Sequence, residues 1–286
     1  MIRSVIIAIL YFMAHFSKGQ QLILRSESQP LGSTILSNGI LDNDAKKNDT
    51  KPFEPKQFKS LDKSIIEREH QVILVGKTAP VGVNIYEIGL FGGYQKTLSQ
   101  QEEDKLFLAD ADRNFDNRDK ASAFFSDMGW QYLSEGNKEL ATNRYNLAYL
   151  LNSRNMDVYW GLGVINYQKG ELEDAVKLMT KGLENDGDKN VALLVDLATV
   201  HIKCFTENHH AADMPQAYEL LDKAIALQPD FANAYMQLAL ANLVDGNIDQ
   251  AWMSFHKGYE KNPGQVDFQL LSELLQQKPD PKGFFK

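Results

Sequence analysis

Small and bulky residues follow one another in a repeating order through the second half of this 286-residue chain. Between Gly129 and Ala148, small residues stand at 129, 141 and 148, and aromatic residues stand at 132 and 145. Matching sets return one period of 34 positions later at Gly163, Asn166, Gly170, Ala175, Met179 and Gly182, and again at Ala239, Asn242, Gly246, Ala251, Phe255 and Gly258. A fixed period of this length indicates similar supersecondary units stacked in series.

Each unit predicts two antiparallel helices, because small residues let helices approach while aromatic rings fill the remaining space. The glycines at 136, 170 and 246 fall between the paired helices, where a positive φ ends the first helix. We expect helix pairs over 122–155, 156–189, 191–231 and 232–265, followed by a capping helix over 266–278. The third pair holds seven extra residues around 206–214, which predict a loop between its helices.

The spacing resembles that of the tetratricopeptide repeat family, whose units carry small residues at positions 8, 20 and 27, bulky ones at 4, 7, 11 and 24, and proline at 32. With units starting at Ser122, Met156 and Ala232, the small positions and the single matching proline are Gly129, Ala141, Ala148, Gly163, Ala175, Gly182, Ala239, Ala251, Gly258 and Pro263. The resemblance covers roughly residues 122–278. It implies a mainly α fold, a solenoid of about four helix pairs with a C-terminal capping helix. Shorter phrases, among them Phe91-Gly92-Gly93, also resemble exported bacterial members of unassigned role.

The chain before residue 101 predicts three further regions. Residues 1–19 combine Arg3, an apolar run of 13 residues and small residues at 17 and 19, which is typical of a secretory signal cleaved after Gly19. A membrane anchor is the alternative, but a spanning helix needs roughly 20 apolar residues. Residues 20–64 are polar and interrupted by proline, which predicts a flexible linker. We assign residues 65–100 to a β-hairpin and docking segment, and residues 101–286 to the repeat domain.

Two β-rich runs, 72–75 and 83–88, predict the hairpin because they flank a turn rich in glycine and proline. An isolated hairpin is barely stable in water, so we expect this one to pack on the rest of the chain. Residues 90–94 are the expected docking segment.

Composition and charge narrow the functional classes. The chain holds 30 Lys and Arg against 38 Asp and Glu, so it lacks the basic footprint of a nucleic-acid-binding protein. Its single cysteine, Cys204, can form neither an intramolecular disulfide nor a cysteine-based zinc site alone. We interpret Cys204 as a packed apolar residue rather than a nucleophile.

Three short patterns imitate chemical motifs. Gly-Lys-Thr at 76–78 ends like a phosphate-binding loop, but Gln71 stands where that loop needs glycine. Residues 110–116 imitate a calcium loop, yet Phe115 replaces the turn glycine and Ala121 the bidentate glutamate, so we expect a polar loop. The predicted insertion contains four residues of metal-ligand type, Glu207, His209, His210 and Asp213. Their spacing matches no fixed template, which leaves a solvated loop tip, a metal site and a partner contact as alternatives.

The resemblance implies a concave groove lined by the first helix of each unit. Carried over position by position, the groove residues are Trp130, Leu133, Trp160, Val164, Tyr167, Thr199, Met236 and Leu240. The set is apolar and aromatic, which departs from the family members that clamp acidic peptide ends and favours an apolar helix or extended peptide. Trp130, Trp160 and Tyr167 are the expected anchors. The alternative is that residues 72–94 fill the groove themselves.

The sequence therefore favours a non-catalytic protein–protein interaction scaffold of the bacterial cell envelope, periplasmic or secreted, with no cofactor. We expect a protein or peptide partner, no nucleic acid and no stable membrane span after signal cleavage, while the oligomeric state stays open. The chain contains no Gly-x-Ser-x-Gly nucleophile motif. Two alternatives are a structural subunit of an envelope assembly with a self-filled groove, and a metal-dependent accessory protein that uses the His-rich insertion.

Overall fold

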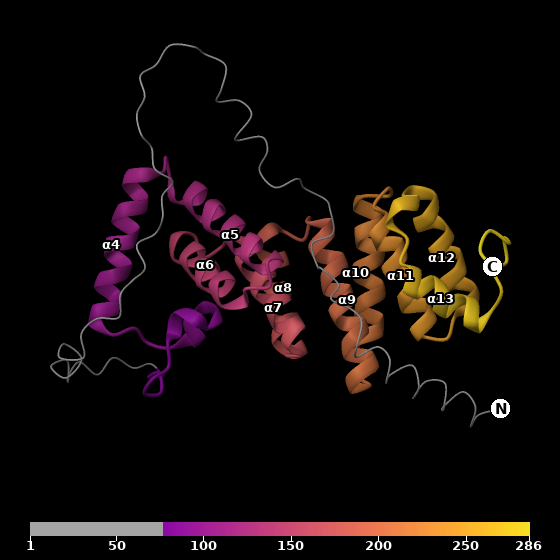
Figure 1. The fold of residues 1–286 in the computed structure, drawn as a ribbon, viewed down its shortest axis with the longest axis horizontal. Coiled ribbons are helices and arrows are strands. Elements are labelled where there is room, and N and C mark those ends of the chain that lie inside the picture. The colour runs from indigo at the N-terminus through magenta and orange to yellow at the C-terminus, as the bar shows by residue number, and fades with distance from the viewer. Residues whose placement is uncertain (1–76) are drawn as a thin grey trace, which may run out of the picture.

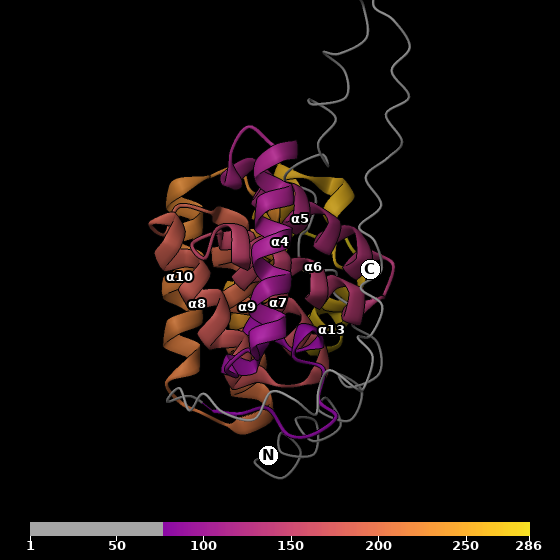
Figure 2. The same cartoon turned by 90° about the vertical axis from the view of Figure 1, so that its left-hand side faces the viewer.

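The computed structural model describes residues 77–286, which form ten α-helices and three 3₁₀-helices and contain no β-strand. The α-helices are α4 (Leu98–Asn114), α5 (Arg118–Ser134), α6 (Lys138–Leu151), α7 (Met156–Lys169), α8 (Leu172–Asp186), α9 (Val191–Asn208), α10 (Asp213–Leu227), α11 (Ala232–Val244), α12 (Ile248–Lys261) and α13 (Phe268–Gln277). They follow one another along the molecule from α4 to α13 (Figure 1). Seen from the α4 end, the later helices lie behind α4 (Figure 2).

Four helix pairs form the body of the fold: α5 with α6, α7 with α8, α9 with α10, and α11 with α12. They confirm the predicted solenoid. The turn glycines at 136, 170 and 246 have φ angles of 79°, 80° and 81°, which end the first helix of three pairs as expected. Asn117, Asn137 and Asn190 each cap a helix by accepting a hydrogen bond from the backbone N–H three residues later.

The ring of Tyr145 connects the first two pairs. This α6 side chain is fully buried and meets the Trp130 ring edge-on at 5.8 Å between centroids. It lies against Gly129 of α5 and Gly161 of α7, where any added Cβ would collide with the ring. Because both neighbours lack a side chain, one aromatic ring packs against helices from two consecutive units.

The connection within the third pair is shorter than the predicted loop. Residues 206–208 belong to α9, which has 18 residues where α7 has 14. The helix ends at Asn208, His209 caps it with a φ of 53°, and α10 begins at Asp213. The inserted residues mainly lengthen α9, whose next residue beyond that length, Phe205, is partly buried against the core.

The predicted strand at 83–88 is wrong. Ile85–Glu87 form the 3₁₀-helix η1, and Gly89–Gly93 form η2. Asn84 caps η1 by accepting a hydrogen bond from the N–H of Tyr86 at 3.1 Å. A cap within the segment and a side chain of α6 form hydrogen bonds with backbone groups that a strand would have paired with a neighbouring strand. The other run of the predicted hairpin, the signal peptide and the linker lie outside the described residues.

Helix α4 precedes the first pair and was not expected as a separate element. Thr97 and Gln100 begin it with a reciprocal capping box. Its last turn includes residues 110–114, so most of the expected polar loop is helical. Asp112, which belongs to the pattern that resembles a calcium loop, instead accepts two hydrogen bonds of 2.8 Å from Arg118.

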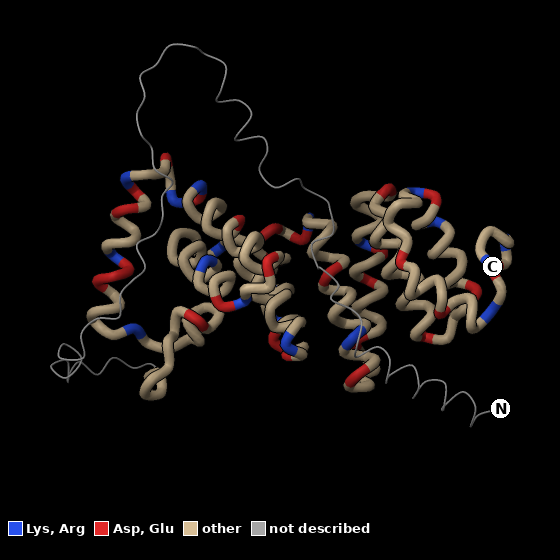
Figure 3. Tube along the Cα trace, viewed as in Figure 1, with Lys and Arg blue, Asp and Glu red and all other residues tan. Residues whose placement is uncertain are grey.

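Charges of both signs are distributed along the solenoid (Figure 3). Some opposite charges pair between neighbouring units, as Lys223 does with Asp188 at 2.9 Å and Lys261 with Asp230 at 2.6 Å. Such exposed pairs contribute little stability individually. Within residues 77–286, no helix combines the length and apolar character that crossing a membrane requires.

Helix α13 confirms the predicted cap, and the residues after it are fastened to α12. The Asp280 carboxylate accepts hydrogen bonds from the backbone N–H groups of Lys282, Phe284 and Phe285 at 2.8, 2.7 and 3.0 Å. His256 Nε2 lies 2.9 Å from Asp280 Oδ1, within ion-pair distance but outside hydrogen-bonding geometry. The C-terminal residues thereby cover the last helix pair.

Acid is expected to destabilise this C-terminal end. Burial lowers the pKa of His256, although the nearby Asp280 carboxylate opposes the shift. The His256 side chain therefore binds a proton more readily in the unfolded chain than in the folded protein. The folded protein loses stability as the pH falls below about 6.5 toward the lowered pKa. Replacing His256 by glutamine (His256→Gln) removes the titration. Between about pH 7 and pH 5, the thermal midpoint of the wild type should fall further than that of the variant. Parallel pH curves for the two proteins would contradict this expectation.

Candidate functional site

The eight predicted groove residues lie on the first helices of the four pairs and are buried. Their exposed fractions are between 1% and 8%. They are Trp130 and Leu133 on α5, Trp160, Val164 and Tyr167 on α7, Thr199 on α9, and Met236 and Leu240 on α11. In this structure they form part of the core instead of an open surface. The prediction that they contact a partner stays a prediction.

Aromatic side chains that bridge neighbouring first helices cause much of this burial. The rings of Trp130 and Trp160 meet edge-to-face, with centroids 5.1 Å apart. Trp130 Nε1 donates a hydrogen bond to Asp157 Oδ1 at 3.1 Å, and Trp160 Nε1 donates one to Asp196 Oδ2 at 2.8 Å. The ammonium group of Lys203 lies 4.6 Å from the Tyr167 ring centre. Family position alone did not predict these bridges, because they depend on ring size and on acceptors in the next unit.

The segment ahead of α4 docks on α6. Asn146, a fully buried α6 residue, donates hydrogen bonds from Nδ2 to the carbonyls of Tyr86 at 3.0 Å and Ile88 at 2.8 Å. Phe91 packs near Tyr149, and Gly89 lies against Leu162 of α7. The described part of the segment thus contacts α6 and Leu162, which is not among the eight predicted groove residues. Within the expected docking segment, 90–94, Phe91 is buried at this contact.

A left-handed turn shapes this docked segment. Leu90 and Phe91 have φ angles of 51° and 57°, which cost about 1–2 kcal/mol each for residues with a Cβ. Burial of Phe91 offsets part of this cost. The Lys96 ammonium lies 3.4 Å from the Phe91 ring centre and pairs with Asp104 of α4 at 2.5 Å. The turn is therefore held from both α6 and α4.

Removing the Asn146 amide should release the segment. The change Asn146→Ala deletes two hydrogen bonds worth about 2 kcal/mol together, which corresponds to a roughly 30-fold rise in the open population. Trypsin should then cleave after Lys96 correspondingly faster, as measured by mass spectrometry over time. Asn143→Ala, on the same helix, is the control and should cleave at the wild-type rate. Equal cleavage of both variants would show that Asn146 does not hold the segment.

The tetratricopeptide repeat profile matches residues 126–190, which cover most of the first two helix pairs. Residues 126–190 are thus similar to tetratricopeptide repeats. A tetratricopeptide repeat-containing protein of Methanocaldococcus jannaschii is 26% identical over 153 residues, covering 51% of this chain. The match spans only 26% of that relative.

Two solved tetratricopeptide-like structures show limited similarity to this chain. PilF of Pseudomonas aeruginosa is 23% identical with a TM-score of 0.49, and the match covers 56% of this chain and 70% of PilF. A thermophilic tetratricopeptide repeat protein of Thermus thermophilus is 17% identical with a TM-score of 0.49, covering 55% of this chain and 82% of the other. Tetratricopeptide repeat proteins are generally non-catalytic protein–protein interaction scaffolds.

The His-rich insertion of the third helix pair does not form a ligand cluster. Asp213 is paired with His201 of α9 at 2.7 Å, and His210 lies 3.7 Å from its other oxygen. Glu207 faces Lys203 at 3.7 Å. No three His, Cys, Asp or Glu side chains in residues 77–286 are grouped so that they could hold a metal ion.

Cys204 lies in the same helix pair, on the buried face of α9. Burial, reinforced by the negative charges of Asp213 and Glu207, raises its pKa to about 11. The thiol is therefore protonated at neutral pH, whereas the thiolate is the nucleophilic form. Its placement agrees with the interpretation of Cys204 as a packed apolar residue.

Proposed function

We propose that this chain is an exported, non-catalytic scaffold of the cell envelope that binds a protein or peptide segment. The observation that carries the proposal is the series of four stacked helix pairs with a tetratricopeptide repeat match over residues 126–190. A stack of this kind offers a long, rigid surface without requiring any reacting group. The apolar leader at residues 1–19 supports the export part of the proposal.

The buried aromatic residues give the surface its rigidity, and the exposed positions beside them are available to a partner. On α5, Asp127, Gln131 and Ser134 are exposed, and their spacing places them on one side of the helix next to the buried Trp130. The eight predicted groove residues offer a partner little surface, because at most 8% of each is exposed. We therefore place the first contact on the exposed α5 residues.

A photoreactive residue in place of Gln131 tests partner binding. The full chain is expressed in its native host and irradiated, and adducts are identified by mass spectrometry. The matched control carries the photoreactive residue at Lys257, an exposed position on the second helix α12. We expect a defined envelope protein to be captured at 131 but not at 257, and the purified pair to bind. Identical capture at both positions, or none at 131, would contradict the proposed contact.

The mass of the native chain tests export separately. Cleavage after Gly19 leaves a mature protein that begins at Gln20. We expect this species in the envelope or secreted fraction. Finding residues 1–19 on the protein recovered from its native host would refute the proposed cleavage.

A further inference from the structure

Helix α4 has little contact of its own with the helix pairs. Ala111 is the one buried residue among its 17, whereas α5 and α6 bury seven residues each. The ring of Phe107 meets that of Phe125 on α5, with centroids 5.3 Å apart. Leu106, one position earlier, is 68% exposed. A helix that buries so few side chains depends on other contacts to keep its place.

The docked segment ahead of α4 supplies such contacts through Lys96. Its ammonium group pairs with Asp104 of α4 at 2.5 Å, and the two side chains are only 12% and 15% exposed. The Tyr86 hydroxyl donates a hydrogen bond of 3.3 Å to the same carboxylate, and Gln101 Nε2 donates one of 2.9 Å to the carbonyl of Lys96. Breaking a largely buried ion pair is costly, because each charge is left without its partner where water is scarce. The docked segment and α4 are therefore joined firmly to each other.

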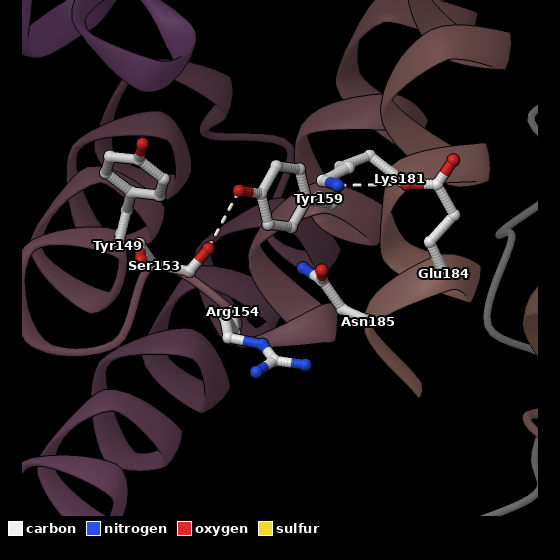
Figure 4. Close-up of a pocket in the computed structure, with 7 residues that line it drawn as sticks. All are labelled: Tyr149, Ser153, Arg154, Tyr159, Lys181, Glu184 and Asn185. Atoms are coloured by element: carbon white, nitrogen blue, oxygen red, sulfur yellow. Dashed lines mark hydrogen bonds and ion pairs between the residues drawn. The ribbon is translucent and has the colours of Figure 1, made fainter. Parts of the chain in front are cut away.

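The docked segment is in turn held on α6. The Asn146 amide binds two of its carbonyls, and the Phe91 ring lies 6.5 Å from that of Tyr149 between centroids. Tyr149 also meets Tyr159 of α7 edge-to-face at 6.3 Å, and both rings line the same pocket between α6, α7 and α8 (Figure 4). The segment thus rests on a part of the solenoid that is packed against the next unit.

A short connection links α4 to the first helix pair. Residues 115–117 separate α4 from α5, and Phe115 and Asn117 have extended backbone conformations. A few non-helical residues of this kind can absorb a rotation between two helices. The pair between Asp112 and Arg118 spans the connection and keeps the two helix ends together. The connection therefore has the features of a hinge.

Backbone strain in the docked segment lowers the cost of opening this hinge. Leu90 and Phe91 have φ angles of 51° and 57°, in the left-handed region that residues with a Cβ rarely adopt. Contacts with α6 keep them there. When the segment leaves α6, both residues can return to ordinary backbone conformations, and this gain offsets part of the lost contacts.

We propose that residues 77–114 form a single hinged cap that opens about residues 115–117. Loss of either the α6 or the α5 contact leaves the cap attached at one place, while the pair of Lys96 and Asp104 keeps its two parts together. Opening is therefore cooperative. It uncovers the Phe125 ring of α5 and the Asn146 amide of α6 at the same time. The cap thus controls the exposure of the N-terminal end of the solenoid, a role separate from partner binding.

Hydrogen exchange of the full chain, resolved by mass spectrometry, tests the cap from the α6 side. In Asn146→Ala we expect exchange to rise by the same factor, about 30-fold, in residues 84–93 and in the middle of α4, residues 103–110. The rise in α4 is the decisive result, because both hydrogen bonds of Asn146 go to the docked segment and not to α4. Faster exchange in 84–93 with α4 at the wild-type rate would overturn the proposal.

Phe107→Ala tests the cap from the α5 side. If the two parts open together, exchange in residues 84–93 should rise along with that of α4, by about tenfold or more. Leu106→Ala is the matched control, because it truncates an exposed apolar side chain of the same helix, and both regions should then exchange as in the wild type. Faster exchange in α4 alone after Phe107→Ala would show that the two parts open separately. Partner capture at position 131 does not depend on this result.

Discussion

Replacing Gly161 by alanine is expected to lower the free energy of unfolding by about 2 kcal/mol or more. A Cβ at this position would lie 2.5 Å from Cε2 of Tyr145 and closer still to its Cζ and hydroxyl. The ring cannot move aside freely, because Tyr145 is fully buried and has Gly129 on its other side, where a Cβ would lie 2.6 Å away. The overlap must therefore push α6 and α7 apart.

The higher helix propensity of alanine opposes this steric cost, but its contribution is smaller. Alanine favours a helix over glycine by about 1 kcal/mol, and this alone would make Gly161→Ala stabilising within α7. Overpacking a dense core typically costs about 1–3 kcal/mol and more where the neighbour is rigid. The obstacle here is an aromatic ring rather than the end of a flexible chain, so we expect the steric cost to exceed the helical gain.

Gly258→Ala provides a matched control. It also adds a Cβ within a helix, but the nearest atom, at 2.9 Å, is Cε at the flexible end of Met236. Urea unfolding followed by far-ultraviolet circular dichroism should show a clearly smaller loss for this variant. In a Tyr145→Leu background the cost of Gly161→Ala should shrink, as a double-mutant cycle would record. An equal cost with and without the tyrosine ring would contradict the explanation.

The repeated helix pairs could be predicted from the sequence because their packing repeats with the period of the sequence. Gly129 and Tyr145 stand at signature positions, and the structure places them in contact. Gly161 has the same steric role toward Tyr145 but stands outside the signature, so the repeat pattern did not point to it. The period predicts which helices pair, whereas individual contacts between units depend on side chains that need not repeat.

The docked segment could not be predicted from local pattern. Its β-branched residues suggested a strand, but the carbonyls of Tyr86 and Ile88 bind Asn146, about 60 positions away in the chain. Local propensity carries no information on such a distant donor. Local propensity does not predict the left-handed conformation of Leu90 and Phe91 either, because contacts with α6 and Lys96 stabilise it.

The burial of the groove residues also could not be predicted from the repeat signature. Position within a unit indicates which way a side chain points, but burial also depends on how far the next unit's side chains extend. Trp130 and Trp160 are large enough to meet across the gap between first helices. A substitution of Trp160 can therefore distinguish a stabilising role from a direct binding role for this residue.

Trp160→Ala is expected to lower the free energy of unfolding by about 3–5 kcal/mol, the usual cost of truncating a buried tryptophan. Trp160 is 3% exposed, and its removal deletes the contact with Trp130 and the hydrogen bond to Asp196. Trp160→Phe, which keeps an aromatic ring but loses the indole N–H, should cost clearly less.

Urea unfolding followed by far-ultraviolet circular dichroism measures both changes without relying on tryptophan emission. Because each unit contacts mainly its neighbours, the loss should concentrate at the junction of α5, α7 and α9, and hydrogen exchange should rise there first. An open binding anchor would behave differently. If Trp160→Ala kept wild-type stability and lost only affinity for the captured partner, the indole would be a contact surface, as the repeat signature alone predicted, and its assignment to the core would be wrong.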